Sequence, residues 1–557
     1  MSEDSLAPRK LALVSGTLFA TAACLTVFTL RDYGIATDVP NYFTSSLLQI
    51  EWVRALFGLS DSPETGSALS AEVIRDYWRW WPVRVPHPPL SRELGGLSYV
   101  AFSRLLDPLS AYRIGVALVY ALLVSGCGTL VAWSGRSVLA GLASGAAVLT
   151  VPALFAYGHL ALTDMYLAAF WFGAVATLEV YLFGRGRGWL WASGLFLGAA
   201  LATKFTGLLL IPVLIVWLAI RRSLRIRDVI PLLVVAGVFF FAVNPALWLE
   251  PVRGVREYLT SGFGRVDDAG TQLQTLYFGH VYSFRPPWHY PFVWTAIVIP
   301  IPWLIAIGFG LAQAPRSRLV QLALINVGVV YGALLLPSAP LHDGIRLFLP
   351  AFPFLCVIAG LGVKATADAI QARLPAERRP TFDALAALVL LAFVALPAYR
   401  TGQAHPYQLS YFNTLVGGIR GAQARGLEVT GMKEALSPEV LDELREAIPP
   451  DALIDGGFFM EEMCFYQAVG SAPRSWQLES ELRDRDSGEP QAWVCRSEDS
   501  FVTIRLPRSP REREYMFVLN RPGQFRAAER ALVGHGGRPF YQLSVQGVPL
   551  FMVYRLR

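Results

Sequence analysis

The stretch Leu11–Leu30, LALVSGTLFATAACLTVFTL, is an uninterrupted run without a charged side chain. An α-helix needs about 20 predominantly apolar residues to cross the hydrocarbon core of a bilayer. Similar runs recur as far as about Pro397, and charged residues make up only 16% of the 557-residue chain. Soluble domains carry about 25% charged residues. The sequence therefore predicts an α-helical polytopic membrane protein.

Eleven apolar runs are predicted to be transmembrane helices. Their approximate ranges are 11–30, 112–133, 138–156, 164–183, 189–203, 205–220, 229–247, 292–313, 319–337, 347–363 and 382–397. A cleavable signal peptide is not expected, because the first run is long and no small-residue cleavage site follows it.

The basic residues fall mainly in every second short loop between these runs. These loops contain Arg9/Lys10, Arg136, Arg185/Arg187, Arg221/Arg222/Arg225/Arg227, Arg316/Arg318 and Lys364/Arg373/Arg378/Arg379. The positive-inside rule assigns them to the cytoplasm, together with the N-terminus. An odd number of spans then leaves the C-terminal region outside, whereas an even number would place it inside. We expect a multi-pass protein of the cell inner (plasma) membrane.

The net charge of +6 reflects this loop pattern and does not indicate nucleic-acid binding.

Apolar runs stop after Tyr399, and the chain becomes charged. We expect a membrane-embedded domain, 1–400, with long outer loops at 31–111 and 248–291. An extracytoplasmic α/β domain, 401–557, is expected to follow.

Several short elements are predicted outside the membrane. In the first outer loop, the amphipathic Val73–Trp81 and the segment Ser91–Leu106 are expected to be helices in the interface. Alternating residues predict strands in the C-terminal domain, and a helix lies between them. The strands are Phe501–Leu506, Tyr515–Asn520, Phe540–Val545 and Pro549–Arg557, and the helix is Gln524–Gly534.

Cys464 and Cys495 are the only cysteines in the expected outer domain. Thiols outside the cytoplasm tend to oxidise, so a Cys464–Cys495 disulfide is predicted. Cys24, Cys127 and Cys356 fall within spans and are expected to be packing residues.

Ionisable residues beside the outer ends of spans are candidates for function, because such groups are costly to bury near a membrane. They are Asp38, His87, Asp164, Lys204, Asp343 and Arg346. The alternative is that each is a solvated loop charge. Lys204 could also be a lysine that extends to the membrane surface, and Asp38 could cap the helix that follows it.

The second outer loop is rich in aromatic residues such as Trp288, and its residues His289 and Tyr290 are further candidates for substrate binding. Trp and Tyr also favour the membrane interface, so anchoring is the alternative to binding. The chain has no G-x-x-x-x-G-K-[ST] loop and no G-x-G-x-x-G motif after a strand. An outer site without nucleotide binding favours a lipid-anchored activated substrate.

Asp38, followed by His87-Pro88-Pro89-Leu90, resembles protein O-mannosyltransferases and the lipid A aminoarabinose transferase. These are GT-C glycosyltransferases with a family 39-type membrane domain. His159-Leu-Ala-Leu-Thr-Asp164 is similar to their acidic motif at the start of the fourth span. Ala202-Thr203-Lys204 is similar to their lysine between spans five and six.

Later segments also resemble bacterial members of this family. They are Arg285-Pro-Pro-Trp288-His289-Tyr290, His342-Asp-Gly-Ile-Arg346-Leu-Phe-Leu-Pro350 and Tyr411-Phe-Asn-Thr-Leu-Val-Gly-Gly418. The resemblance covers about residues 10–420. The chain departs from it in the first loop, where many relatives have an Asp-Glu pair and Asp38 is followed by Val39.

The resemblance implies transfer of one hexose or pentose from a polyprenyl-phosphate sugar to a hydroxyl of an extracytoplasmic acceptor, with inversion. No cofactor or metal is expected. Asp38 would be the general base, and Lys204 and Arg346 would neutralise the lipid phosphate. Asp164 and His87 would orient the acceptor or the loop, and His289, Tyr290 and Asp343 would join the substrate site. The alternatives are an oligosaccharyl ligase that uses a lipid pyrophosphate, a lipid or solute transporter, and a glycan-binding scaffold.

The loop charges predict the orientation of the chain. Reporter fusions after Arg222 and Arg318 should give cytoplasmic signals, and a fusion after Arg400 should give an outside signal. A cytoplasmic signal after Arg400 would contradict the eleven-span topology and the placement of the C-terminal domain.

Overall fold

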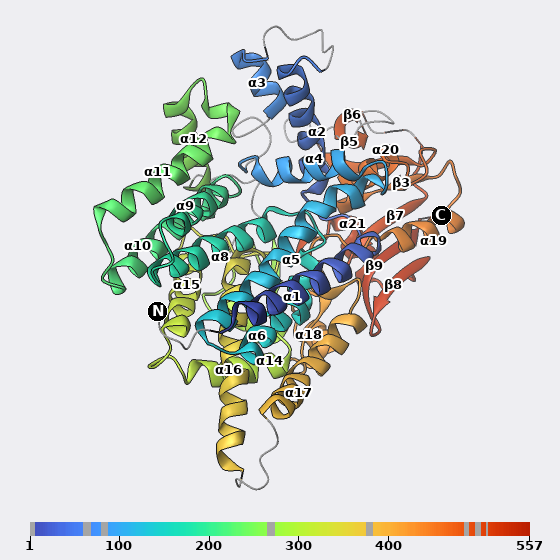
Figure 1. Cartoon of the computed structure of the whole chain (residues 1–557). Coiled ribbons are helices and arrows are strands. Elements are labelled where there is room, and N and C mark those ends of the chain that lie inside the picture. The colour runs from blue at the N-terminus through green and yellow to red at the C-terminus, as the bar shows by residue number, and fades with distance from the viewer. Residues whose placement is uncertain are drawn as a thin grey trace.

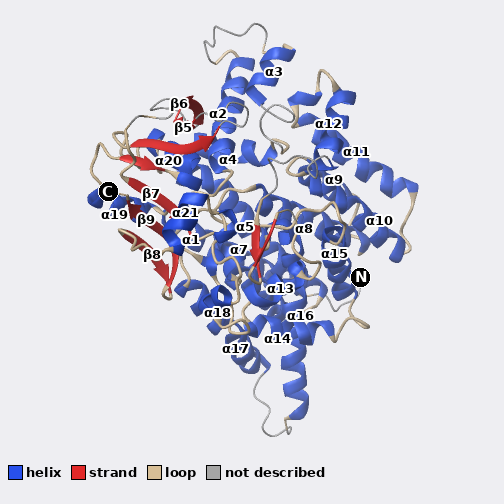
Figure 2. Cartoon of the chain, turned by 180° about the vertical axis from the view of Figure 1, so that it is seen from behind, coloured by secondary structure: helices blue, strands red, loops and turns tan. Residues whose placement is uncertain are grey.

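The computed structural model describes residues 6–59, 68–78, 87–263, 273–283, 285–374, 382–483, 490–495, 503–507, 509 and 511–556. A bundle of helices forms the larger part of the molecule, and a β-sheet from the C-terminal region lies along one side of it in both views (Figure 1, Figure 2). The expected α-helical membrane architecture with a C-terminal α/β region is therefore confirmed.

Each of the eleven predicted spans coincides with one or two helices. The helices are α1 (Pro8–Phe28), α5 (Pro108–Ser134), α6 (Val138–Thr150), α7 (Pro152–Tyr157), α8 (Thr163–Leu182), α9 (Gly188–Leu201), α10 (Leu210–Ile220), α11 (Ile226–Ala242), α13 (Tyr290–Val298), α14 (Ile301–Leu311), α15 (Arg318–Leu334), α16 (Phe352–Arg373) and α17 (Phe382–Gln403).

Within the described residues, 5 helices are long and apolar enough to cross a membrane, or up to 6 if one bent pair counts as a single span. Several other spans are shorter apolar helices of 10–17 residues. The chain is a multi-pass membrane protein, and the number of eleven crossings stays a prediction.

The bent pair is α13 and α14, whose axes differ by 118°. Pro300 lies at the break and has no N–H to donate to the carbonyl of Ala296. Asn413 replaces the missing donors. Its Nδ2 donates to the carbonyls of Ala296 and Ile299, at 2.7 Å each, and its backbone N–H donates to Ile297 at 2.8 Å. Asn413 belongs to the segment Tyr411–Gly418, which resembles bacterial relatives, and this residue of the segment stabilises the bend between α13 and α14.

The two outer loops contain their own helices. The first has α2 (Val39–Leu56), α3 (Ala71–Trp78) and α4 (Leu90–Phe102), and the second has α12 (Pro251–Phe263) and a hairpin of β1 (Thr275–Tyr277) and β2 (His280–Tyr282). The helices expected from Val73 and from Ser91 are therefore present. Residues 79–81 of the first one lie outside the described residues.

The C-terminal region forms a seven-stranded mixed sheet with the order β6-β5-β4-β3-β7-β9-β8. Strand β3 pairs in parallel with β4 and β7, and the other pairs are antiparallel. The strands are β3 (Leu453–Asp455), β4 (Gln477–Arg483), β5 (Pro490–Cys495), β6 (Thr503–Pro507), β7 (Tyr515–Leu519), β8 (Tyr541–Val545) and β9 (Val548–Arg555).

Four helices accompany the sheet: α18 (Gly418–Ala424), α19 (Pro438–Ala447), α20 (Met460–Ala468) and α21 (Ala527–Gly534). The predicted C-terminal strands and the helix are present, although residues 501 and 502 lie outside the described residues. Strands β3, β4 and β5 and helices α18, α19 and α20 were not anticipated from the sequence. The structure joins Cys464 of α20 and Cys495 of β5 in a disulfide.

The segment between α1 and α2 is held from both sides. Arg113 of α5 is buried and donates to the carbonyls of Leu30, Tyr33 and Gly34, at 3.1, 2.8 and 2.5 Å. On the other side, a Cβ at Gly34 would lie 2.4 Å from the carbonyl oxygen of Glu434, so only glycine fits there. This clamp positions the residues that precede α2.

Asn413→Ala should destabilise the protein. It removes the side-chain donors to the partly buried carbonyl of Ala296 and the buried carbonyl of Ile299, and a buried polar group left unsatisfied costs about 1–3 kcal/mol. The midpoint of thermal unfolding, Tm, of the full chain in detergent should fall clearly. Thr414→Ala, at the exposed neighbouring residue, is the control and should change little. Equal Tm values for the two variants would contradict this role of Asn413.

Candidate active site

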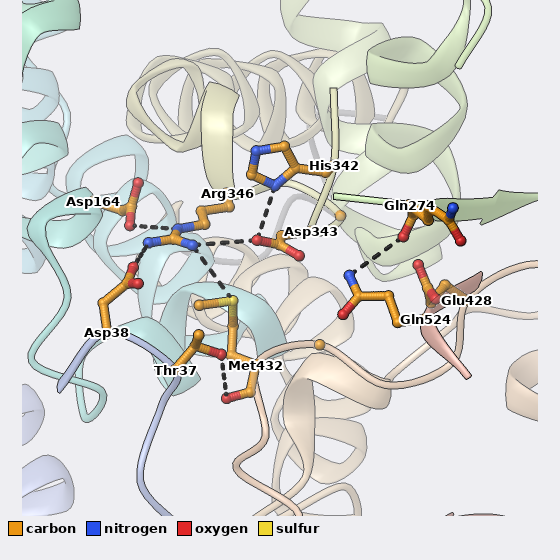
Figure 3. A network of polar contacts seen from close by, with 12 residues as sticks. Thr37, Asp38, Asp164, Gln274, His342, Asp343, Arg346, Glu428, Met432 and Gln524 are labelled. Atoms are coloured by element: carbon orange, nitrogen blue, oxygen red, sulfur yellow. Dashed lines mark hydrogen bonds and ion pairs between the residues drawn. The ribbon is translucent and has the colours of Figure 1, made fainter. Parts of the chain in front are cut away.

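The guanidinium of Arg346 contacts three carboxylates that come from distant parts of the chain (Figure 3). Its Nε lies 3.1 Å from Asp164 and its Nη1 3.2 Å from Asp343, and its Nη2 forms an ion pair with Asp38. Arg346 begins the 3₁₀ segment Arg346–Ala351 and is buried. Asp343 and Gly344 both adopt positive φ angles, 57° and 62°, and this turn directs Arg346 toward the carboxylates.

Asp164 lies in the first turn of α8 and is 1% exposed. Its Oδ1 accepts a hydrogen bond of 2.6 Å from Nζ of Lys204, which is also buried. Lys204 lies in the break between α9 and the 3₁₀ segment Phe205–Leu209. Its ammonium therefore points into the protein toward Asp164 and does not extend to the membrane surface.

Asp38 precedes the first residue of α2, but its side chain makes no capping hydrogen bond. The carboxylate turns toward Arg346 instead. Its side chain is 33% exposed, whereas those of Asp164 and Asp343 are 1% and 2% exposed. Asp38 is thus the carboxylate of the cluster that a substrate can reach.

Asp343 connects the cluster to the C-terminal region. It forms an ion pair with Arg521 and shares a hydrogen bond of 2.9 Å with Nδ1 of His342. Burial alone would raise the pKa of Asp343, but Arg521, His342 and Arg346 outweigh this effect and hold its pKa well below the usual value. Tyr290 supports the same turn, because its Oη accepts a hydrogen bond of 3.1 Å from Gly344 N–H.

Glu428 lies on the other side of Arg521, with Nε of Arg521 3.5 Å from its carboxylate. Both residues line a small pocket together with Tyr157, Trp294 and Asp343. Burial raises the pKa of Glu428 to about 7, although Arg521 partly opposes this shift.

The other sequence candidates lie near this cluster in different ways. His87 packs its ring against Tyr42 of α2, with 6.4 Å between the ring centroids. Tyr42 lies within electrostatic reach of Asp38, Arg346 and Asp164. His289 shares a 2.8 Å hydrogen bond with Tyr277 of β1, and none of its hydrogen bonds in the described structure joins it to Arg346.

Sequence reasoning missed Arg521, Glu428 and Met432. Arg521 follows β7, and its place beside Asp343 depends on how the sheet packs against the helices. Met432 contributes a sulfur atom 3.9 Å from Arg346. No local pattern distinguishes these residues from the many other charged and apolar residues of the C-terminal region.

Glu428 should make the stability of the protein depend on pH. An unfolded glutamate has a pKa of about 4.3, so between about pH 4.5 and 7 the folded protein binds more protons than the unfolded chain. Stability is then lost as the pH rises through this window. Raising the pH from 5 to 8 should lower the Tm of the wild type more than that of Glu428→Gln.

Glu446→Gln, at an exposed residue of α19, serves as the control and should behave like the wild type. Burial also raises the pKa of Glu462 to about 7, but Glu462 is present in all three proteins and its contribution cancels. The same pH dependence in Glu428→Gln and the wild type would contradict the assignment.

Comparison with known proteins supports the resemblance noted in the sequence. A family model described as dolichyl-phosphate-mannose-protein mannosyltransferase matches residues 107–248, which include Asp164 and Lys204. No curated protein matches the chain. ArnT from Cupriavidus metallidurans bound to undecaprenyl phosphate matches with a TM-score of 0.50 and 15% identity, over 97% of each chain.

Two further solved structures match less well. ArnT from Cupriavidus metallidurans in the apo state gives a TM-score of 0.47 and 17% identity, over 79% of this chain and 82% of ArnT. The S. cerevisiae protein O-mannosyltransferase Pmt1-Pmt2 complex bound to the sugar donor gives 0.30 and 16%, over 49% and 40%. The match to lipid-bound ArnT extends over nearly the whole chain, and the chain therefore has the fold of the GT-C glycosyltransferases.

Proposed function

We propose that this protein transfers one sugar, a hexose or a pentose, from a polyprenyl-phosphate donor to a hydroxyl of an extracytoplasmic protein, lipid or glycan. One observation supports this proposal most strongly. The partly exposed carboxylate of Asp38 contacts Arg346, beside the buried ion pair of Asp164 and Lys204. The fold shared with ArnT, which was solved with undecaprenyl phosphate, supports a lipid-phosphate donor.

Asp38 has the geometry for a general base. One carboxylate oxygen, Oδ2, contacts Arg346, and none of the described hydrogen bonds involves Oδ1. An acceptor hydroxyl can therefore bind Oδ1 and lose its proton to it as the new bond forms. Arg346 keeps the carboxylate in place through the reaction, and Asp164 and Asp343 in turn hold Arg346.

The transfer inverts the anomeric carbon. The acceptor oxygen attacks that carbon from the face opposite the phosphate, and its proton passes to Asp38. The bond between the anomeric carbon and the phosphate oxygen breaks, and the electron pair leaves with the polyprenyl phosphate. One glycosidic bond replaces another, so no oxidant, reductant or further reactant is required.

The reaction needs no metal or other cofactor in this proposal. Asp38, Asp164 and Asp343 all contact the guanidinium of Arg346, so this cation occupies the position between the three carboxylates. The bilayer supplies the donor lipid, and the C-terminal region, 401–557, is placed outside the cytoplasm with the acceptor. No nucleic acid takes part.

Asp38→Asn should abolish most of the turnover while the protein stays folded. Asparagine cannot accept the proton, and removal of a general base costs typically about 100-fold or more. Membranes that contain the variant would be supplied with radiolabelled undecaprenyl-phosphate hexoses and pentoses, and sugar transfer to the membrane fraction would be measured.

Asn41→Ala, at an exposed residue in the first turn of α2, is the control and should keep its activity. An unchanged Tm for Asp38→Asn would show that Arg346 is still held by its other two carboxylates. Turnover of Asp38→Asn close to that of the wild type would end the assignment of Asp38 as the base and would direct attention to Asp164.

A further inference from the structure

Arg92, near the start of α4, is a buried cation whose guanidinium has no hydrogen-bond partner within the described part of the chain. It is 1% exposed, and none of its guanidinium nitrogens has a hydrogen-bond partner among the residues that the structure describes. Burial lowers the pKa of Arg92 to about 10, so it keeps its charge at neutral pH. Buried polar groups in native proteins are nearly always hydrogen-bonded, and each exception requires an explanation.

Arg113 shows what a structural buried arginine looks like in the same protein. It is equally buried, at 1%, but two of its nitrogens donate to three backbone carbonyls. Two of the three guanidinium nitrogens of Arg113 thus bind carbonyls of the chain, whereas among the described residues none of those of Arg92 has a partner.

The other buried cations around the candidate site already have carboxylate partners. Lys204 pairs with Asp164, Arg346 with three aspartates, and Arg521 with Asp343 and Glu428. Their charges are offset before any substrate binds. Glu93, next to Arg92 in sequence, forms no ion pair with it in the described structure. Burial raises the pKa of Glu93 to about 8, so it is largely neutral at pH 7.

Among the described residues, further buried polar groups on α4 next to Arg92 and on the facing helix α2 have no hydrogen-bond partner. They include the hydroxyls of Ser45 and Ser91 and the side-chain amide of Gln49. Helices α2 and α4 pack closely here: Ser46 donates to the carbonyl of Arg92 at 2.8 Å, and a Cβ at Gly96 would lie 3.2 Å from that of Ser46. A guanidinium has only donors, and the hydroxyls and the amide can donate as well as accept, so the group as a whole suits a ligand rich in acceptors, such as phosphate.

This location adjoins the candidate active site. Tyr42 lies within electrostatic reach of Arg92 as well as of Asp38 and Arg346. The backbone N–H of Leu90 donates to the carbonyl of Ala202 at 3.1 Å, two residues before Lys204. An anion beside Arg92 would therefore lie on the α4 side of the candidate site, within electrostatic reach of the same tyrosine as Asp38 and Arg346.

We propose that Arg92 binds the phosphate of the polyprenyl donor and stabilises it as the leaving group. The inference rests on the proposed function and revises one expectation from the sequence. The sequence suggested that Lys204 and Arg346 neutralise the phosphate. In this inference Arg92 binds the phosphate, and Lys204 and Arg346 hold the aspartates of the site in place.

Binding and stability should respond in opposite directions. Without ligand, Arg92→Gln should have a Tm equal to or above that of the wild type, because an unpaired buried charge is removed. Its dissociation constant for undecaprenyl phosphate should rise by at least about 10-fold, since charge-assisted hydrogen bonds to phosphate are lost. Arg113→Gln should lower the unliganded Tm, and Arg104→Gln, at an exposed residue after α4, should change neither quantity.

The experiment uses the purified full chain in detergent with three probes. Undecaprenyl phosphate should bind the wild type, whereas undecaprenol, with the same tail and no phosphate, and inorganic phosphate should bind much more weakly. Arg92→Lys, which keeps the charge but not the planar fork, should bind undecaprenyl phosphate with intermediate affinity.

Two results would overturn the inference. One is undecaprenyl phosphate binding by Arg92→Gln with wild-type affinity. The other is wild-type binding of inorganic phosphate as tight as that of the lipid. In both cases the proposed function stands if the wild type transfers sugar. Conversely, Arg92-dependent lipid binding without sugar transfer from any donor would leave the inference in place and contradict the proposed function.

Discussion

The contact of one buried guanidinium with three carboxylates organises the whole candidate site. Arg346 joins the start of α2, the start of α8 and the turn before α16, segments that lie far apart in sequence. Burying charges is expensive unless they are paired and hydrogen-bonded. The three segments can therefore meet only in the arrangement that satisfies Arg346, and the depth and direction of Asp38 follow from it.

The neighbouring interactions extend this constraint to the rest of the chain. Arg113 holds the segment before Asp38 through three carbonyls. Tyr466 of α20 accepts a hydrogen bond from Ile35 N–H and donates one to the carbonyl of Leu436. Arg521 then connects the region after β7 to Asp343. The sheet is thus part of the support of the site and is not an independent attachment.

The membrane helices could be predicted from the sequence because each is an apolar run of sufficient length. The same topology indicated that Asp38, Asp164, Lys204 and Arg346 lie at one end of the bundle. Their pairing could not be predicted, since it depends on the angles at which helices meet. Strand β4 has the sequence QLESELR. It contains several charged residues and none of the β-branched or aromatic residues that are typical of strands, so the sequence did not predict it. Arg92 was hidden within a segment interpreted as an interfacial helix, and only packing shows that it is buried.

The most direct test of this account is an experimental structure of the full chain with undecaprenyl phosphate bound. The account predicts the phosphate at the guanidinium of Arg92, with Asp38 facing it across a space that one sugar ring can fill. Arg346 should still contact Asp38, Asp164 and Asp343. A phosphate bound away from α4, or too far from Asp38 for one sugar to lie between them, would contradict the account.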